Sequence, residues 1–118
     1  MQGRESFPKR ERILRPEEYI NVFRNGTKTV GPAFICYVDR QPGNGRKLGL
    51  AVSRQVGKAV TRNRIKRYIR EMYRKNRRHI DEECRLVVVA RPSAASMNYH
   101  ACEQAIGQLL RKGGILHE

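Results

Sequence analysis

The chain has 118 residues, which suits one domain with a modest core, and its apolar fraction of 39% favours a folded chain over a disordered one. The 25 Lys and Arg outnumber the 11 Asp and Glu, and the formal net charge of +14 predicts a polyanionic partner, nucleic acid before an anionic membrane. No apolar run approaches the ~20 residues of a membrane span and the N-terminus lacks an apolar signal segment, so we expect a cytoplasmic protein with no membrane partner.

The N-terminal part of the chain predicts a basic segment followed by a helix. Residues 1–15 are polar and basic with few apolar residues, and we expect them to be extended and partly mobile. A helix is predicted over 16–25, because Pro suits its first position and the following Gly26 ends it. Its Tyr19 and Phe23 are i, i+4 neighbours, which are either core residues or rings on which nucleic-acid bases stack.

Three strands are predicted next. The first two cover 27–30 and 33–38, with a Gly-Pro break between them, and Tyr37 lies in the second. The turn-forming residues 41–45 predict a hairpin loop into a third strand over 48–53, in which large apolar residues alternate with small ones.

The longest predicted helix begins at Ala59 and has two opposed faces. At helical spacing, its apolar residues form a single stripe: Ile65, Tyr68, Ile69, Met72 and Tyr73. The polar residues that gather opposite this stripe are Asn63, Lys66, Arg67, Arg70 and Arg74, with Arg62 and Arg64 on the flanks. Solvated helical faces usually interleave acids at i, i+4, but Glu71 is the only acid here. We therefore interpret this face as a phosphate-binding surface, for which the planar guanidinium of Arg is well suited.

The rest of the chain predicts a central strand and a final helix. After a polar connection, residues 86–90 show no alternation, which is typical of a strand covered on both faces. Asn98 can cap the last helix, whose apolar stripe holds Cys102, Ile106, Leu109 and Leu110. The whole order is helix, three strands, helix, strand, helix. It predicts a single domain with an α+β fold, a two-layer sandwich of helices on a four-stranded sheet.

The sequence predicts no catalytic site within the protein. A protein nuclease needs acids that gather around Mg²⁺ or a pair of His for acid–base chemistry, whereas here the acids are scattered and the three His share no spacing. Cys36, Cys84 and Cys102 are odd in number and widely separated, which indicates reduced thiols rather than a disulfide framework or a zinc site.

Residues 52–67, VSRQVGKAVTRNRIKR, resemble the protein subunit of bacterial ribonuclease P. The Arg-Asn-Arg triplet at 62–64, followed by Ile-Lys-Arg, is the most specific match, and weaker matches extend over nearly the whole chain. The resemblance implies an accessory subunit of a ribonucleoprotein endonuclease, a hydrolase in which an RNA subunit with bound Mg²⁺ removes the 5′ leader from precursor tRNA. The protein would raise substrate affinity, with no obligate protein partner. The resemblance also implies a mixed sheet, element order αβββαβα and a left-handed βαβ crossover, although crossovers are generally right-handed.

The resemblance further assigns two binding surfaces. The RNA-subunit face would comprise Arg62, Asn63, Arg64, Lys66, Arg67 and Arg70. A cleft between the first helix and the sheet would hold the leader through Tyr19, Phe23, Tyr37, Arg54, Gln55, Lys58 and Ala59. Gln55 stands where the family usually has Lys and Lys58 where it usually has Asn, so a positive charge is displaced by three residues. The resemblance assigns the protein no catalytic residue and no metal ligand.

Two other functions are compatible with parts of this pattern. A basic ribosomal or RNA-chaperone protein of similar fold would explain the charge and the basic helix, but not the paired aromatic residues. A membrane-surface protein would use the same helix, but the apolar stripe contains two Tyr and lacks the Trp, Phe and Leu that such helices usually carry.

Overall fold

The computed structural model describes residues 7–40, 43 and 45–117, and its elements follow the predicted αβββαβα order. The helices and strands are α1 (Pro16–Asn25), β1 (Thr27–Val30), β2 (Phe34–Arg40), β3 (Lys47–Ala51), α2 (Ala59–Asn76), β4 (Cys84–Ala90) and α3 (Tyr99–Lys112). Short 3₁₀ helices precede α1, follow α2 and precede α3. The α+β fold with a four-stranded mixed sheet is confirmed.

The strands lie in the order β1-β2-β4-β3. Strand β2 is antiparallel to both of its neighbours, whereas β3 and β4 are parallel. The predicted hairpin between the second and third strands is therefore wrong, because β4 lies between them. The physical reason is the composition of β4: its uninterrupted apolar run buries both faces, so it takes a central place with a partner on each side.

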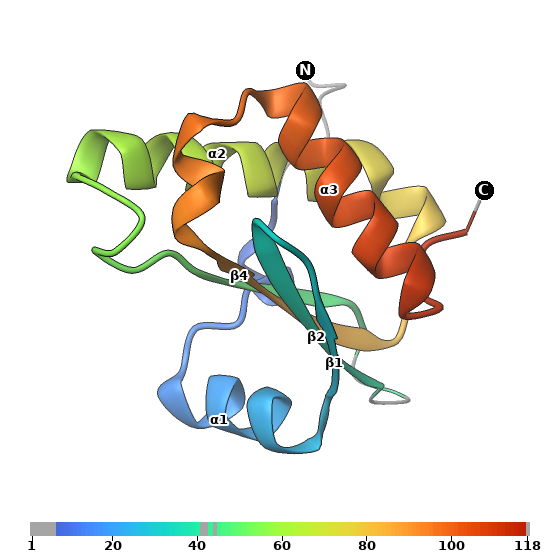
Figure 1. Ribbon diagram of the computed structural model, residues 1–118. Coiled ribbons are helices and arrows are strands. Elements are labelled where there is room, and N and C mark those ends of the chain that lie inside the picture. The colour runs from blue at the N-terminus through green and yellow to red at the C-terminus, as the bar shows by residue number, and fades with distance from the viewer. Residues whose placement is uncertain (1–6, 41–42, 44, 118) are drawn as a thin grey trace.

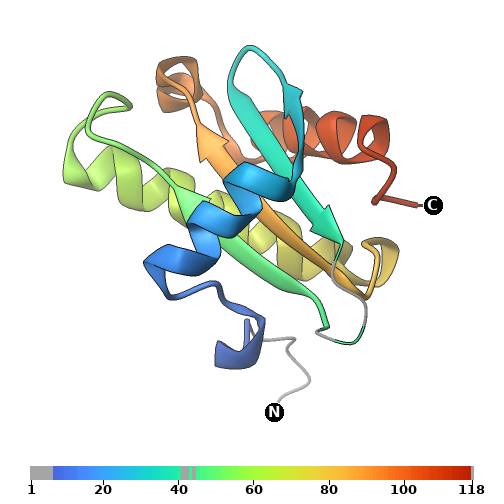
Figure 2. The same cartoon turned by 90° about the horizontal axis from the view of Figure 1, so that it is seen from below.

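The connection from β3 through α2 to β4 is left-handed, as the resemblance implies. In Figure 2 the sheet is seen from the side of α1, and α2 lies behind it. When that view is turned so that β3 and β4 point upward, β4 lies to the right of β3. The chain therefore leaves β3, passes behind the sheet through α2 and returns on the right as β4. A crossover with this course is left-handed. General rules of chain connection would have predicted the opposite hand.

The helices cover both faces of the sheet, with α2 and α3 on one side and α1 across the other (Figure 1). The predicted apolar stripe of α2 is buried except for the half-buried Tyr68, and that of α3 is buried throughout. The predicted cap is present, since the Asn98 side chain accepts a hydrogen bond of 2.8 Å from the Ala101 amide. All three Cys are free and buried, and burial raises the pKa of the Cys36 thiol to about 12.

The segment before α1 is attached to the core at two points. Glu11 is only 6% exposed, accepts a hydrogen bond of 2.7 Å from the Tyr73 hydroxyl and pairs with Arg77. Ile13 is buried, and its amide donates to the Leu48 carbonyl at the outer edge of β3. The expected mobility of residues 1–15 falls in part on residues 1–6, which lie outside the described residues. From residue 7 onward the segment follows the edge of the sheet.

A close contact between Gly49 and Tyr19 gives a test of this packing. A Cβ at Gly49 would lie 2.7 Å from the Cε1 of Tyr19, whose hydroxyl accepts a hydrogen bond of 3.2 Å from the Leu50 amide. We expect Gly49→Ala to displace the ring and to lower the free energy of unfolding by about 1–3 kcal/mol.

The matched background for this test is Tyr19→Ala, in which the obstructing ring is absent. There, Gly49→Ala should cost much less, and chemical denaturation of the four proteins measures the coupling. If the two substitutions were additive, the ring would not rest on Gly49.

Candidate nucleic-acid interface

The sheet face that carries α1 is built from rows of residues paired across the four strands. Residues directly opposite one another in neighbouring strands share a face of the sheet. One such row contains Lys28, Tyr37, Val87 and Gly49, and the next contains Val30, Ile35, Val89 and Ala51. Helix α1 covers the first row except for the exposed Lys28, whereas the second row is apolar and only partly covered, with Val30 at 51% exposure. An apolar floor therefore lies beside α1.

Three aromatic rings border this floor. The rings of Phe23 and Tyr37 meet edge to face with centroids 4.8 Å apart, and those of Tyr19 and Phe23 are 6.4 Å apart. Phe23 is 40% exposed, and the α1 residue that fills the core beneath the helix is Val22, at 0% exposure. The core interpretation of Phe23 is therefore wrong. We call the floor and these three rings the aromatic cleft, because all three rings were assigned to the leader cleft that the resemblance implies.

The other residues assigned to the leader lie where β3 leads into α2. Arg54 and Gln55 are exposed in the turn that follows β3, Lys58 is the residue before the first turn of α2, and Ala59 begins that helix. This turn continues from Ala51, which is part of the apolar floor. Within the described part of the chain, no hydrogen bond or ring contact joins these four residues to the three rings.

Lys28 is a cleft residue that reasoning from the sequence missed. It is exposed on β1, is paired with Tyr37 across the sheet, and its Nζ lies 5.9 Å from the centroid of the Tyr37 ring. Alternation within 27–30 could indicate only which residues share a face. It could not indicate that β1 pairs with β2 in the register that places this Lys beside the ring.

The basic face of α2 is divided between exposed and anchored side chains. Asn63, Arg67 and Arg70 are exposed, whereas Arg62, Arg64 and Lys66 are half-buried. Arg62 and Arg64 donate to the backbone carbonyls of Gly57 and Ala95. The six predicted residues thus lie on one helix, with three side chains exposed and the two flanking Arg side chains held by backbone carbonyls.

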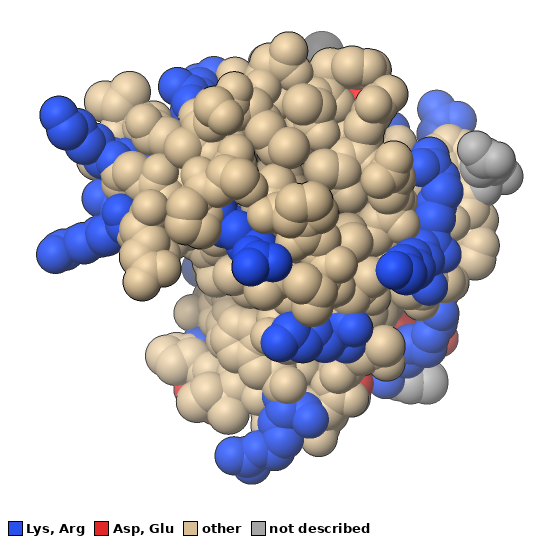
Figure 3. Space-filling model, viewed as in Figure 1, with Lys and Arg blue, Asp and Glu red and all other residues tan. Residues whose placement is uncertain are grey.

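Acids are sparse around this surface. On α2 itself the single acid, Glu71, pairs with Arg74 through two hydrogen bonds of 2.8 and 2.9 Å. Figure 3 shows separate groups of Lys and Arg on one face of the molecule and very little Asp or Glu, with basic side chains projecting at the end where α2 begins. Such a distribution creates a positive potential that attracts polyanions.

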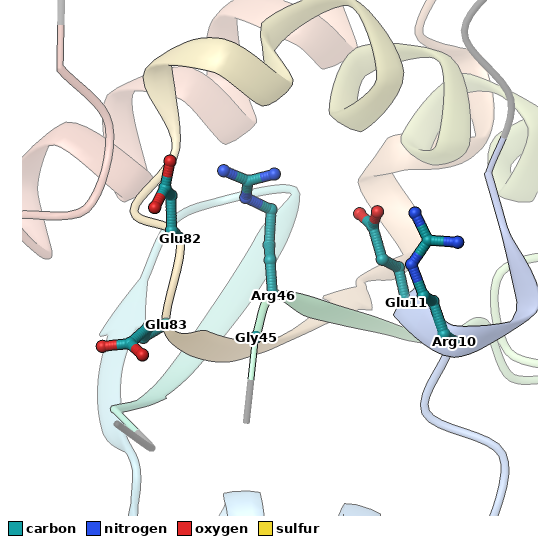
Figure 4. A pocket seen from close by; sticks show the side chains of 6 residues that line it. All are labelled: Arg10, Glu11, Gly45, Arg46, Glu82 and Glu83. Carbon is teal, nitrogen blue, oxygen red and sulfur yellow. The ribbon is translucent and has the colours of Figure 1, made fainter. Parts of the chain in front are cut away.

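One hollow near the start of β3 gathers acids, but in an arrangement unsuited to a metal ion. Glu82 and Glu83 lie on one side of this hollow and Glu11 on the other, with Arg46 between them (Figure 4). Arg46 is held by the carbonyls of Ile80 and Asp81. Among the described residues, no group of three or more His, Cys, Asp or Glu could hold a metal ion. Mixed charge also makes this hollow a poor phosphate site.

The helices of the described region include none that is long and apolar enough to span a membrane.

The model of the Ribonuclease P family matches residues 7–114. The chain belongs to the ribonuclease P protein family. The predicted family is therefore confirmed, and with it a role among tRNA-processing proteins.

Individual members of the family are similar along almost the entire chain. The ribonuclease P protein component of Dictyoglomus thermophilum is 35% identical over 116 residues, which cover 96% of both chains. That of Geobacillus kaustophilus is 40% identical over 109 residues, 92% of this chain and 90% of its own. The solved structure of the Staphylococcus aureus RNase P protein superimposes with a TM-score of 0.84 at 26% identity, covering 91% of this chain and 98% of its own.

Proposed function

We propose that the chain is the protein subunit of a ribonuclease P ribonucleoprotein and that it binds two RNAs on two different surfaces. The basic face of α2 takes the RNA subunit, and the aromatic cleft takes the single-stranded 5′ leader of precursor tRNA. The observation that carries the proposal is the separation of these surfaces: α2 lies on one side of the sheet, and the cleft with α1 lies on the other. One small domain can therefore contact both RNAs at once.

The chemistry of the basic face favours a folded RNA. Arg67 and Arg70 are exposed cations with no hydrogen bond or ion pair to any described residue, so their full charge is available to phosphates. Arg62 and Arg64 each use part of a guanidinium on a backbone carbonyl and keep further N–H donors for phosphate oxygens. Their fixed positions reduce the conformational entropy lost on binding.

The aromatic cleft favours a single strand. Bases of any identity stack on aromatic rings, and the half-open apolar floor can accept their faces. Lys28 at the β1 edge can neutralise a leader phosphate, as Arg54 and Lys58 can at the end of β3. Lys58 supplies the charge that the family usually has at position 55.

Hydrolysis itself is assigned to the RNA subunit and its Mg²⁺. The carboxylates of the described residues do not gather into a site that fits this ion, so the protein's part is to raise substrate affinity.

Reconstitution tests the proposal directly. Added at low Mg²⁺ to a transcript of a bacterial ribonuclease P RNA, the protein should accelerate removal of the 5′ leader from precursor tRNA, because it supplies cations and a leader site. Protein freed of RNA should show no cleavage. Cleavage by RNA-free protein that is lost on mutation of Asp39 would contradict this division of roles.

The basic face predicts a change in salt dependence. Arg67→Ala or Arg70→Ala should weaken binding to the RNA subunit and reduce the slope of log K against log salt by roughly 0.7–0.9, as expected for one lost phosphate contact. Arg111→Ala, at an exposed position of α3, is the matched control and should leave the slope unchanged. Wild-type behaviour of both α2 variants in a salt titration would place the RNA elsewhere.

The aromatic cleft predicts a loss that depends on leader length. Phe23→Ala should cost about 1–3 kcal/mol of affinity for precursors with several leader nucleotides, and hardly any for a one-nucleotide leader or mature tRNA. Because Phe23 is 40% exposed, the melting temperature should change little. Lys28→Ala should reduce the salt dependence for long leaders only. Equal losses at every leader length, together with a large fall in melting temperature, would refute the cleft assignment.

A further inference from the structure

Two hollows flank Leu14 at the edge of the sheet, and the inner one adjoins the aromatic cleft at Tyr19. The inner hollow, of about 560 Å³, lies between the segment before α1, the edge of β3 and α2, and its lining includes Arg12, Leu14, Tyr19, Leu50, Lys66 and Arg70. The outer hollow, of about 620 Å³, also contains Arg12 and Leu14. Leu14 lines both hollows and is 56% exposed, and we call it the apolar ridge between them.

The inner hollow combines cations with an apolar wall. Arg12, Lys66 and Arg70 line it, and none of the described residues that line it is an acid. Lys66 and Arg70 have no hydrogen bond or ion pair to any described residue, whereas leucines and the Tyr19 ring supply the wall. A nucleotide has the complementary chemistry, with a charged phosphate and a flat base that is poorly hydrated on its faces.

The outer hollow is more mixed but still basic. It is lined by Lys9, Arg10 and Arg15 in addition to Arg12. Two acids are among the described residues that line it, and one of them, Glu18, is already paired with Lys47 at 3.1 Å. The cations therefore exceed the available acids, and a phosphate is favoured here as well.

The ridge itself is held firmly. The neighbouring Ile13 is 3% exposed, and its amide donates a hydrogen bond of 3.0 Å to the Leu48 carbonyl. Arg12 donates two hydrogen bonds, of 3.0 and 2.7 Å, to the Phe7 carbonyl. Leu14 is thus an exposed side chain on an anchored backbone, as suits an apolar wedge between two bases.

We infer that the two hollows take successive unpaired nucleotides of the RNA subunit, with Leu14 inserted between their bases. The inference rests on the proposed function and adds a site to it. The RNA subunit is favoured over the leader because Lys66 and Arg70 belong to the basic face of α2. The Tyr19 hydroxyl accepts a hydrogen bond from the Leu50 amide, which holds the ring in place. This ring lines the inner hollow and also contacts the Phe23 ring, so it lies between the inner hollow and the rings of Phe23 and Tyr37.

Leu14→Ala tests this site, with Ile20→Ala as the matched control. Ile20 is an aliphatic side chain on α1 with 53% exposure, and it lines neither hollow. Against a transcript of a bacterial ribonuclease P RNA, Leu14→Ala should weaken binding by about tenfold through lost apolar contact. The slope of log K against log salt should not change, because no charge is removed. Ile20→Ala should bind like wild type.

Chemical probing of the same complexes identifies the nucleotides. Two adjacent bases that wild-type protein protects from dimethyl sulfate or a carbodiimide should become reactive with Leu14→Ala and stay protected with Ile20→Ala. Wild-type affinity of Leu14→Ala, an equal loss with Ile20→Ala, or a loss that appears only with long leaders would overturn the inference. If the Arg67 and Arg70 variants also bound like wild type, the proposed function would fail rather than this site alone.

Discussion

Burial of β4 on both faces is the constraint on which the rest of the structure depends. Its apolar run can be shielded only if helices lie on each side of the sheet, and α2 with α3 on one side and α1 on the other meet this need. The same arrangement separates the basic face of α2 from the aromatic cleft. The burial of this strand thus also determines that the two surfaces proposed to bind RNA lie on opposite sides of the sheet.

The charge of the chain opposes folding and favours binding. The excess positive charge of +14 is mutually repulsive, and α2 alone carries seven of the 25 Lys and Arg with only one acid. The buried stripe of α2, the hydrogen bonds of Arg62 and Arg64 to backbone carbonyls and the ion pair of Arg74 with Glu71 offset this cost. RNA phosphates would remove the remaining repulsion, so binding and stability should be coupled.

The outer edge of β3 is covered by the segment before α1 and by the Tyr19 side chain. An exposed edge offers unpaired backbone groups to other chains. Here Ile13 pairs with the Leu48 carbonyl and the Tyr19 hydroxyl bonds to Leu50, so both outward-facing positions are occupied. Because these contacts hold the segment before α1 in place, they also set the position of Leu14 between its two hollows.

The sequence by itself determined what depends on local periodicity and capping. Local patterns predicted the apolar stripe and the opposite basic face of α2, the cap at Asn98 and the central place of β4, because helical and strand spacing act within a few residues. Only the tertiary structure decided the insertion of β4 between β2 and β3, the left-handed crossover, the pairing of Lys28 with Tyr37 and the burial of Glu11 against Tyr73. Each of these joins residues far apart in the chain. Their pairing depends on how the whole sheet and its helices bury apolar surface, which no local pattern encodes.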